Sequence, residues 1–262
     1  MCMANKKRAA KVAANDKRQA VQLGKNSKSG SNWDLEFKIN HHHRLTENQQ
    51  KFLDYAQSKT GSIDDHEIAN MCLVDGPAGT AKTYIGVLAA LNLLQSNEVE
   101  SIIYIRSIVE SASRHMGALP GELEDKFAPW SMPLIDKLDE LLPPGISNNL
   151  MTKEYIKCVP VNFTRGLTFR DSCVIVDEAQ NLTTSELTTI LTRFGYNSKY
   201  IVIGDTNQSD INGKSGFGKI FNAFDHPSCI DNGIRTFKFD GNDIVRSKIL
   251  RFIVDRLDTI AS

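Results

Sequence analysis

The chain has 262 residues, of which 41% are hydrophobic and 24% charged, and its formal net charge is +0. This composition is ordinary for a globular protein in water, and no apolar run approaches the ~18 residues that a membrane-spanning helix needs. Five widely spaced cysteines without a C-x-x-C pair argue against a zinc site and a disulfide framework. The basic N-terminus lacks the apolar core of a secretory signal. We therefore expect a cytoplasmic protein with no membrane partner.

Residues 1–32 differ in charge from the rest of the chain. They contain eight basic residues against Asp16 alone, whereas the remaining residues carry 23 basic and 30 acidic side chains. A segment this rich in Lys, Ala, Asn, Ser and Gly is predicted to be disordered, with the folded domain spanning residues 33–262. Two interpretations of the basic arm are equally consistent with its composition: a nucleic-acid contact or a solvated tail.

The first predicted elements precede a glycine-containing loop. The histidine run 41–43 is predicted to form a surface loop, because adjacent residues of an extended segment point to opposite faces. Thr46 is a candidate cap for a helix over 47–58. Gln49 lies in its first turn, and a glutamine amide can match the donor and acceptor edge of adenine. An apolar run at 71–75 predicts a strand.

The loop that follows is one glycine short of the phosphate-binding motif G-x-x-x-x-G-K-[ST]. In that motif the backbone N–H groups cradle phosphates, Lys82 would reach the β and γ phosphates, and the Thr83 hydroxyl would hold Mg²⁺. An apolar helical pattern follows, whose N-terminal dipole favours anions. Ala81 replaces the usual glycine, which is sterically mild if its φ is negative. The predicted nucleotide contacts are Gly76, Pro77, Ala78, Gly79, Thr80, Ala81, Lys82, Thr83 and Tyr84.

Further strands and helices alternate along the rest of the chain. This alternation predicts an α/β fold with a mostly parallel sheet and helices on both faces. The pattern around 243–257 predicts a final helix docked through an apolar stripe that includes Ile249, Phe252 and Ile253. Strands are predicted at 101–105, 158–161, 173–176, 200–203 and 234–239, with helices at 132–142 and 184–194.

Polar side chains follow two of these strands. Asp177 and Glu178 end an apolar strand, where a phosphate-loop enzyme needs one acid for Mg²⁺ and another group to orient the attacking water. Gln208 follows the next strand and can hydrogen-bond a γ-phosphate oxygen or that water. The simpler interpretations are a solvated strand end for the acids and an Asx-type turn for the segment containing Gln208.

Four arginines are candidates for contacts with anions. An arginine in cis or in trans stabilises the transition state of phosphoryl transfer, although each of these side chains could equally form a surface ion pair. The candidates are Arg106, Arg165, Arg193 and Arg246.

The order of these motifs resembles the PhoH-like ATPases of bacteria and phages, and it implies a single RecA-like P-loop NTPase domain. A phage-encoded chain would act in the host cytoplasm. The departures from the family pattern are Ala81 for glycine, Ser107 for proline and Ser247 for histidine. The matching segments are 76–83, 106–110 (RSIVE), 117–123 (GALPGEL), 164–168 (TRGLT), 175–181, 191–195 (LTRFG), 204–211, 214–216 (KSG) and 243–246 (DIVR).

The family in turn resembles the first motor domain of superfamily 1 helicases. That resemblance implies that Gln49 contacts adenine, that Asp177 and Thr83 hold Mg²⁺, and that Glu178 is the catalytic base. It implies further that Gln208 senses the γ phosphate and that the strand end at Arg106 faces a nucleic-acid path.

The expected function is Mg²⁺-dependent ATP hydrolysis coupled to binding or unwinding of RNA or single-stranded DNA. The motifs occur once, so we expect a second copy to complete the site within a homo-oligomer, which the resemblance suggests is a hexameric ring. Arg246 or Arg193 would then reach across the interface. The alternatives are a non-motor switch whose assembly depends on ATP, and a kinase. The pair Glu178 and Gln208 favours water activation over phosphate transfer to an acceptor.

Overall fold

The computed structural model describes residues 35–58, 70–107, 123–209, 211, 213–245, 249, 252, 253 and 256, and for residues 123–130 it describes the backbone alone. The predicted basic arm, residues 1–32, lies outside the described part, and so does most of the helix expected at 243–257. Among the described residues, no helix is long and apolar enough to cross a membrane.

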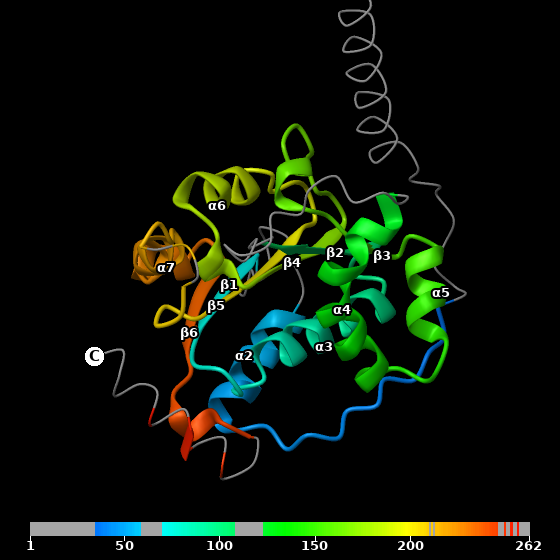
Figure 1. The fold of residues 1–262 in the computed structure, drawn as a ribbon, viewed down its shortest axis with the longest axis horizontal. Helices are drawn as coiled ribbons and strands as arrows, with labels where there is room; N and C mark the ends of the chain where they lie inside the picture. Colours follow the sequence, from blue (N-terminus) through cyan, green and yellow to red (C-terminus); the bar gives the residue numbers. More distant parts are fainter. Residues whose placement is uncertain are drawn as a thin grey trace, which may run out of the picture.

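A sheet of six strands forms the centre of the domain (Figure 1), with the order β3-β2-β4-β5-β1-β6 and parallel pairing throughout. This confirms the predicted RecA-like α/β fold. Strand β5 lies between β1, which precedes the glycine-containing loop, and β4, which ends in the paired acids. The strands are β1 (Met71–Asp75), β2 (Ser101–Arg106), β3 (Ile156–Cys158), β4 (Ser172–Asp177), β5 (Lys199–Gly204) and β6 (Ile234–Lys238).

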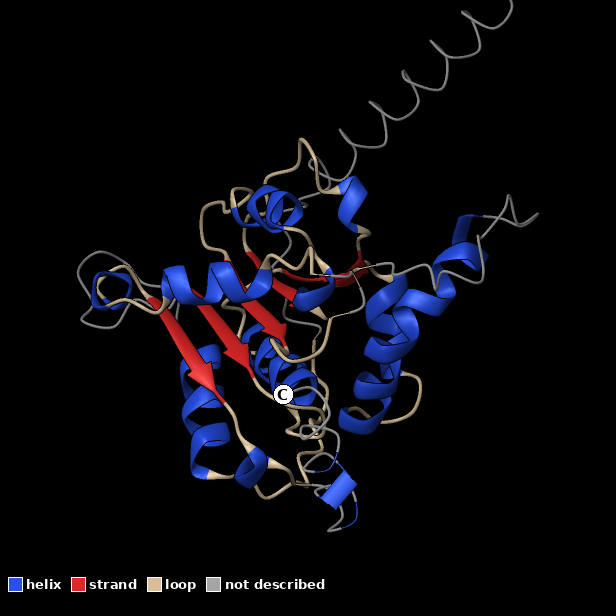
Figure 2. Cartoon of the chain, turned by 60° about the vertical axis from the view of Figure 1, so that its left-hand side comes forward, coloured by secondary structure: helices blue, strands red, loops and turns tan. Residues whose placement is uncertain are grey.

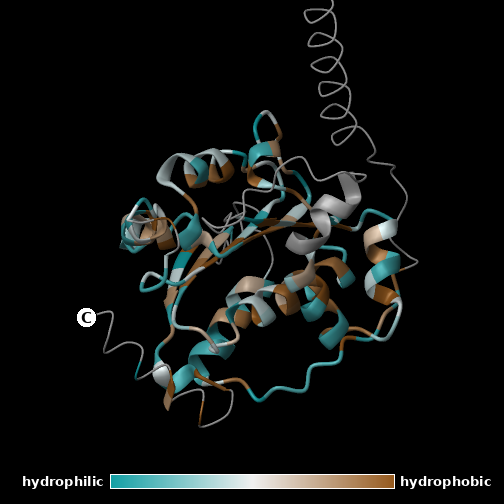
Figure 3. Cartoon of the chain, viewed as in Figure 1, coloured by the Kyte–Doolittle hydropathy of each residue, from teal (hydrophilic) through white to brown (hydrophobic). Residues whose placement is uncertain are grey.

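Helices cover both faces of the sheet (Figures 1 and 2). Successive strand residues point to opposite faces, so the strands of the sheet form two apolar clusters, and Figure 3 shows hydrophobic residues concentrated in the strands. One cluster packs against α2, α3, α4 and α5, and the other packs against α6 and α7. The helices are α2 (Glu47–Gln57), α3 (Lys82–Gln95), α4 (Leu123–Leu141), α5 (Ile146–Thr152), α6 (Thr184–Leu191), α7 (Phe217–Phe224) and the short α8 (Pro227–Ile230).

Helix α2 is held at both ends. A capping box at its start pairs the Thr46 hydroxyl with the backbone of Gln49 and the Gln49 side chain with the backbone of Thr46. At its end, the buried Lys199 of β5 donates hydrogen bonds to the carbonyls of Tyr55 and Ser58. Burial lowers the pKa of Lys199 to about 8. A cation at a helix C-terminus satisfies carbonyls that have no partner within the helix.

The strand register aligns the carboxyl ends of the strands at one edge of the sheet. Asp75 of β1 pairs with Gly204 of β5, and Arg106 of β2 pairs with Asp177 of β4. In open parallel sheets this edge is where ligands bind. The polar residues predicted to act together therefore start from neighbouring positions.

The prediction of a terminal helix docked through its apolar stripe is wrong for the residues that the structure describes there. Ile249, Phe252 and Ile253 are 62%, 55% and 45% exposed, whereas Ile244 just before them is 3% exposed. Amphipathic spacing predicts which side chains share a helix face, but it does not specify a surface for that face to pack on. The chain is anchored up to Ile244, because Asp243 hydrogen-bonds to Thr46 and Asn48 near the start of α2.

Gly204 allows close packing where β5 ends. A Cβ atom at this position would lie 2.4 Å from the ring of Phe217, which is fully buried in α7. We expect Gly204→Ala to lower the free energy of unfolding by about 1–3 kcal/mol, because a buried ring has no space to move into. Urea denaturation measures the change.

Gly218→Ala is the matched control for this substitution. Its Cβ would lie 3.5 Å from the nearest atom, a methyl group of Thr206, and alanine is the better helix former. This variant should therefore unfold at the same or a slightly higher urea concentration. Equal stability of both variants and the native chain would contradict the packing argument.

Candidate functional site

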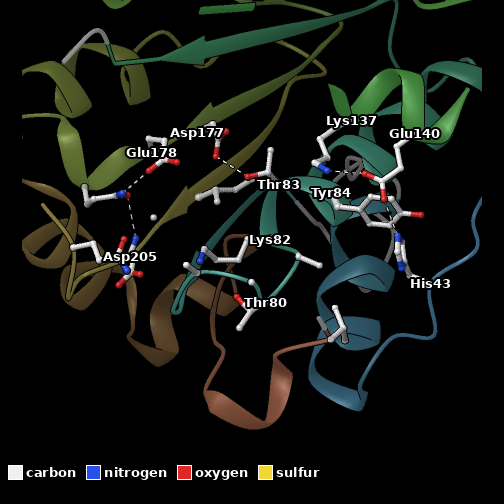
Figure 4. A pocket seen from close by; sticks show the side chains of 18 residues that line it. His43, Thr80, Lys82, Thr83, Tyr84, Lys137, Glu140, Asp177, Glu178 and Asp205 are labelled. Atoms are coloured by element: carbon white, nitrogen blue, oxygen red, sulfur yellow. Dashed lines mark hydrogen bonds and ion pairs between the residues drawn. The ribbon is translucent and has the colours of Figure 1, made fainter. Parts of the chain in front are cut away.

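A cavity of about 280 Å³ opens at the carboxyl edge of the sheet. In Figure 4, Asp177, Glu178 and Asp205 lie on one side of Lys82 and Thr83, while Tyr84, Lys137, Glu140 and His43 lie on the other. Six segments that are distant in the sequence therefore enclose one space. The lining residues are His43, Ala78, Gly79, Thr80, Ala81, Lys82, Thr83, Tyr84, Lys137, Glu140, Asp177, Glu178, Gln180, Ile203, Gly204, Asp205, Gln208 and Val245.

The glycine-containing loop joins β1 to α3 and is stabilised by its own hydrogen bonds. The Thr80 hydroxyl donates to the Pro77 carbonyl at 2.8 Å. The Lys82 ammonium donates to the carbonyls of Gly76 and Pro77, the latter at 2.9 Å. Burial lowers the pKa of Lys82 below its usual value, against the opposing effect of nearby carboxylates, of which Asp205 is the strongest. The loop therefore presents a cation to the cavity from a buried stem.

The negative φ on which a mild effect of Ala81 depends is not what the structure shows. Its φ is 57° and its ψ is 22°, so the residue adopts the left-handed conformation, as Gly79 does with a φ of 84°. The sequence shows that alanine replaces glycine, but the sign of φ follows from how the loop enters α3. A non-glycine residue in this conformation costs about 1–2 kcal/mol. The loop at Ala81 is therefore strained.

Asp177 is the final residue of β4 and is 2% exposed. One of its carboxylate oxygens accepts a hydrogen bond from the Thr83 hydroxyl at 2.9 Å, and the other accepts one from the Tyr104 hydroxyl at 2.6 Å. Burial and the charge of Asp177 raise the pKa of Tyr104 far above its usual value, so Tyr104 remains a donor. Thr83 and Asp177 thus form the adjacent oxygen pair that the sequence predicted, held by a tyrosine that sequence reasoning missed.

Glu178 also lies in the left-handed conformation, with a φ of 53°. Its carboxylate accepts a hydrogen bond from the Gln180 amide at 2.5 Å and pairs with Arg106 at 3.5 Å. The carbonyl oxygen of the Gln180 side chain accepts from the backbone N–H of Asp205 at 3.1 Å. Gln180 therefore links the ends of β4 and β5. Sequence reasoning missed Gln180. It could have been noticed as a polar residue three positions beyond Asp177, in the turn that follows the buried strand.

The segment after β5 forms a turn and places Gln208 at the cavity. Asp205 accepts a hydrogen bond from the Asn207 backbone at 3.0 Å, which forms the Asx-type turn. Gln208 is exposed and lines the same cavity as Lys82 and Glu178. Its position is compatible with a contact to a terminal phosphate, and that role stays a prediction.

Gln49 lies behind the loop and is not a lining residue. It is 0% exposed, and its amide nitrogen donates to the carbonyls of Thr80 at 3.0 Å and Asp243 at 2.7 Å. Its side-chain oxygen accepts from the Thr46 backbone at 2.9 Å. The amide therefore fastens the loop to α2 and to the segment before Val245. Contact with adenine stays a prediction, and these bonds would have to be exchanged for it.

The opposite wall of the cavity was not predicted. Glu140 of α4 accepts hydrogen bonds from Lys137 at 2.6 Å and from His43 at 2.7 Å. Burial opposes ionisation of Glu140, but these two partners lower its pKa overall. The ring of His43 packs edge-on to Tyr84 at a centroid distance of 4.8 Å, and His41 bonds to the Tyr84 hydroxyl. The exposed histidine run is thus part of the site.

The four candidate arginines are not brought together. Arg106 lies at the cavity edge beside Glu178, and Arg165 is exposed in the connection to β4 and does not line the cavity. Arg193 follows α6 at the opposite edge of the sheet, where its carbonyl accepts from the Phe169 backbone. Arg246 lies outside the described residues.

A protein-family model described as PhoH-like protein matches residues 43–258. The chain belongs to the PhoH-like protein family. The PhoH-like protein of Bacillus subtilis is 38% identical over 185 residues, which cover 70% of this chain and 56% of that protein. Protein PhoH of Escherichia coli K12 is 32% identical over 187 residues, covering 70% and 51%. The PhoH-like chain thus spans about half the length of the curated relatives it matches.

Among solved structures, the large terminase of a thermophilic bacteriophage aligns with the PhoH-like chain with a TM-score of 0.49 and 11% identity. The alignment covers 82% of this chain and 50% of that one, and one crystal form of the terminase contains ADP.

Replacing Ala81 by glycine should relieve strain in the loop. The left-handed conformation costs alanine about 1–2 kcal/mol, and the greater freedom of unfolded glycine offsets about 0.5–1 kcal/mol of this. We expect Ala81→Gly to raise the free energy of unfolding by up to about 1 kcal/mol and to change ATP affinity by less than about tenfold, or ~1.4 kcal/mol. Urea denaturation and calorimetric titration measure the two quantities.

Gly79→Ala provides the control of opposite sign, because it places a methyl group at a φ of 84°. This variant should be less stable than the native chain. A destabilised Ala81→Gly variant would contradict the assignment of strain to Ala81.

Proposed function

We propose that this PhoH-like chain binds ATP with Mg²⁺ and hydrolyses the terminal phosphate. The observation that carries the proposal is the single cavity lined by Lys82 and Thr83 from the loop, Asp177 and Glu178 from the end of β4, and Gln208 after β5. These are the groups that nucleotide hydrolysis requires: a phosphate cradle, a metal-binding oxygen pair and a group for the attacking water. Membership of the PhoH-like family supports the same assignment.

The residues at the centre of the cavity fit Mg²⁺. Thr83 and Asp177 offer a hydroxyl and a carboxylate oxygen 2.9 Å apart, and hard oxygen ligands are those that Mg²⁺ prefers. Within the described part of the chain, no group of three or more His, Cys, Asp or Glu side chains forms a metal cage. Mg²⁺ usually takes its remaining ligands from phosphate and water, and when bound it neutralises charge on the phosphates.

The other side chains that line the cavity would have separate roles in hydrolysis. Lys82 would hold the β and γ phosphates, because it lines the cavity and the carbonyls of Gly76 and Pro77 hold its ammonium at the loop. Glu178 would accept a proton from the attacking water, and Gln208 would contact that water or the γ phosphate. The pair of Glu178 and Gln208 at one cavity favours activation of water, which is why we prefer hydrolysis to a kinase reaction.

The proposal extends to nucleic acid and to assembly. Arg106 lies at the cavity edge with its side chain 27% exposed, which suits contact with the phosphates of RNA or single-stranded DNA. Arg193 does not line the cavity of its own chain, so a catalytic role for this residue needs a neighbouring copy. A homo-oligomer, with a hexameric ring as the specific form, would supply such a neighbour.

Two substitutions separate ATP binding from hydrolysis. We expect Lys82→Ala to weaken ATP binding by at least about tenfold, because it removes the charge that faces the phosphates. We expect Glu178→Gln to bind ATP normally but to lower kcat by about 10²–10⁴-fold, which is the usual contribution of a general base. Titration with a labelled nucleotide and a phosphate-release assay check both. Normal turnover by Glu178→Gln would contradict the proposal, and labelled phosphate on an added acceptor would favour a kinase.

The oligomer can be tested through its arginines. In assembled protein, verified by sedimentation with an ATP analogue, loss of an arginine finger should lower kcat by about 10³-fold. We expect this result for Arg193→Ala or Arg246→Ala. Replacement of Arg170, an exposed arginine outside the cavity, by alanine should leave turnover unchanged. Native rates in both candidate variants within a verified assembly would exclude a trans arginine among them.

A further inference from the structure

The catalytic carboxylate proposed above is held by two partners. Arg106 pairs with one oxygen of Glu178 at 3.5 Å, and the Gln180 amide donates to the other oxygen at 2.5 Å. Gln180 also accepts from the backbone of Asp205 after β5. The ends of three adjacent strands are therefore linked at Glu178: the side chains of Arg106 and Gln180 contact it, and Gln180 in turn holds the backbone after β5.

The strand register fixes Arg106 in this position. Arg106 pairs with Asp177 across β2 and β4, so its side chain starts beside the residue that precedes Glu178. Two residues before it on β2, the Tyr104 hydroxyl donates to Asp177 at 2.6 Å. Just beyond Arg106, the Ser107 hydroxyl donates to the Asn181 carbonyl at 2.9 Å. The end of β2 is thus tied to the turn that carries Glu178.

The two partners of Glu178 differ in strength and in exposure. Gln180 is 5% exposed and makes a short hydrogen bond, whereas the Arg106 contact is long and its two side chains are 27% and 38% exposed. Arginine forms its best pairs in a bidentate geometry at a shorter distance, and phosphate offers the same fork. The contact with Arg106 is therefore the one that another anion can replace.

Exchange of this partner would change the freedom of the Glu178 carboxylate. An oxygen that is paired with Arg106 is held at the end of β2 and is not free to turn toward a water in the cavity. Without Arg106, Glu178 would have an oxygen free to face the cavity. The remaining bond to Gln180 would keep the carboxylate at the end of β4.

We propose that Arg106 is a positioning residue that restrains Glu178, and that the phosphodiester backbone of single-stranded nucleic acid releases Glu178 by taking over the guanidinium. This inference rests on the proposed ATPase activity. It couples occupancy of the carboxyl end of β2 to hydrolysis without movement of the phosphate-binding loop. The chemistry recognised is the phosphodiester, so one RNA and one DNA homopolymer serve as probes.

The test measures ATP turnover of the native chain and Arg106→Gln with and without oligo-uridylate or oligo-thymidylate. We expect Arg106→Gln to raise the basal kcat about threefold to tenfold with an unchanged KM for ATP, because one oxygen of the Glu178 carboxylate is then free to turn toward the attacking water. The native chain should be stimulated by an oligonucleotide, and Arg106→Gln should not be. Arg106→Lys keeps the charge and should restore a low basal rate with weaker stimulation.

Two controls connect the effect to Glu178. The double variant Arg106→Gln/Glu178→Gln should be as slow as Glu178→Gln alone, since the released group is then missing. Arg170→Gln removes an exposed arginine outside the cavity and should behave as the native chain. Thermal unfolding of Arg106→Gln at the native temperature confirms that the fold is intact.

Each of the other possible results of this test contradicts a specific part of the proposal. A basal kcat that falls in Arg106→Gln would make Arg106 part of the productive arrangement and contradict restraint. Continued stimulation of Arg106→Gln, or an active native chain that neither polymer stimulates, would contradict release by nucleic acid. A native chain that binds ATP without hydrolysing it would overturn the proposed ATPase instead, independently of Arg106.

Discussion

The parallel register of four adjacent strands is the constraint on which the site depends. Strands β1, β5, β4 and β2 end together, so the loop after β1, the turn after β5, the acids after β4 and Arg106 of β2 meet at one edge. A shift of one residue in a strand would turn each of its side chains to the opposite face. The two apolar clusters prevent such a shift, because each strand is buried on both faces.

Buried polar contacts also hold the glycine-containing loop in place. Gln49 joins α2, Thr80 of the loop and Asp243 near the end of the described chain, and Asp243 in turn accepts from Thr46. A buried amide without partners is costly, so these bonds specify where the three segments lie relative to one another. The loop is therefore positioned from behind by elements that do not line the cavity.

Two of the six described non-glycine residues with a positive φ lie where chemistry is expected. Ala81 and Glu178 both adopt the left-handed conformation, and both line the cavity. Such residues persist only where the surroundings over-determine them, and they cluster at functional sites. The first directs the backbone into α3, and the second turns the Glu178 carboxylate toward Gln180 and Arg106. Strain, register and buried bonds together give the PhoH-like chain a preorganised cavity.

The sequence alone determined the alternation of strands and helices, the loop at residues 76–83 and the acids at 177 and 178, because these features depend on residues close together in the chain. Tertiary structure alone decided that Arg106 meets Glu178 across 72 positions and that His43 meets Glu140 across 97. It also decided the positive φ of Ala81, the inward amide of Gln49 and the exposure of Ile249, Phe252 and Ile253. These outcomes depend on strand register and on packing between distant segments, which local spacing does not encode.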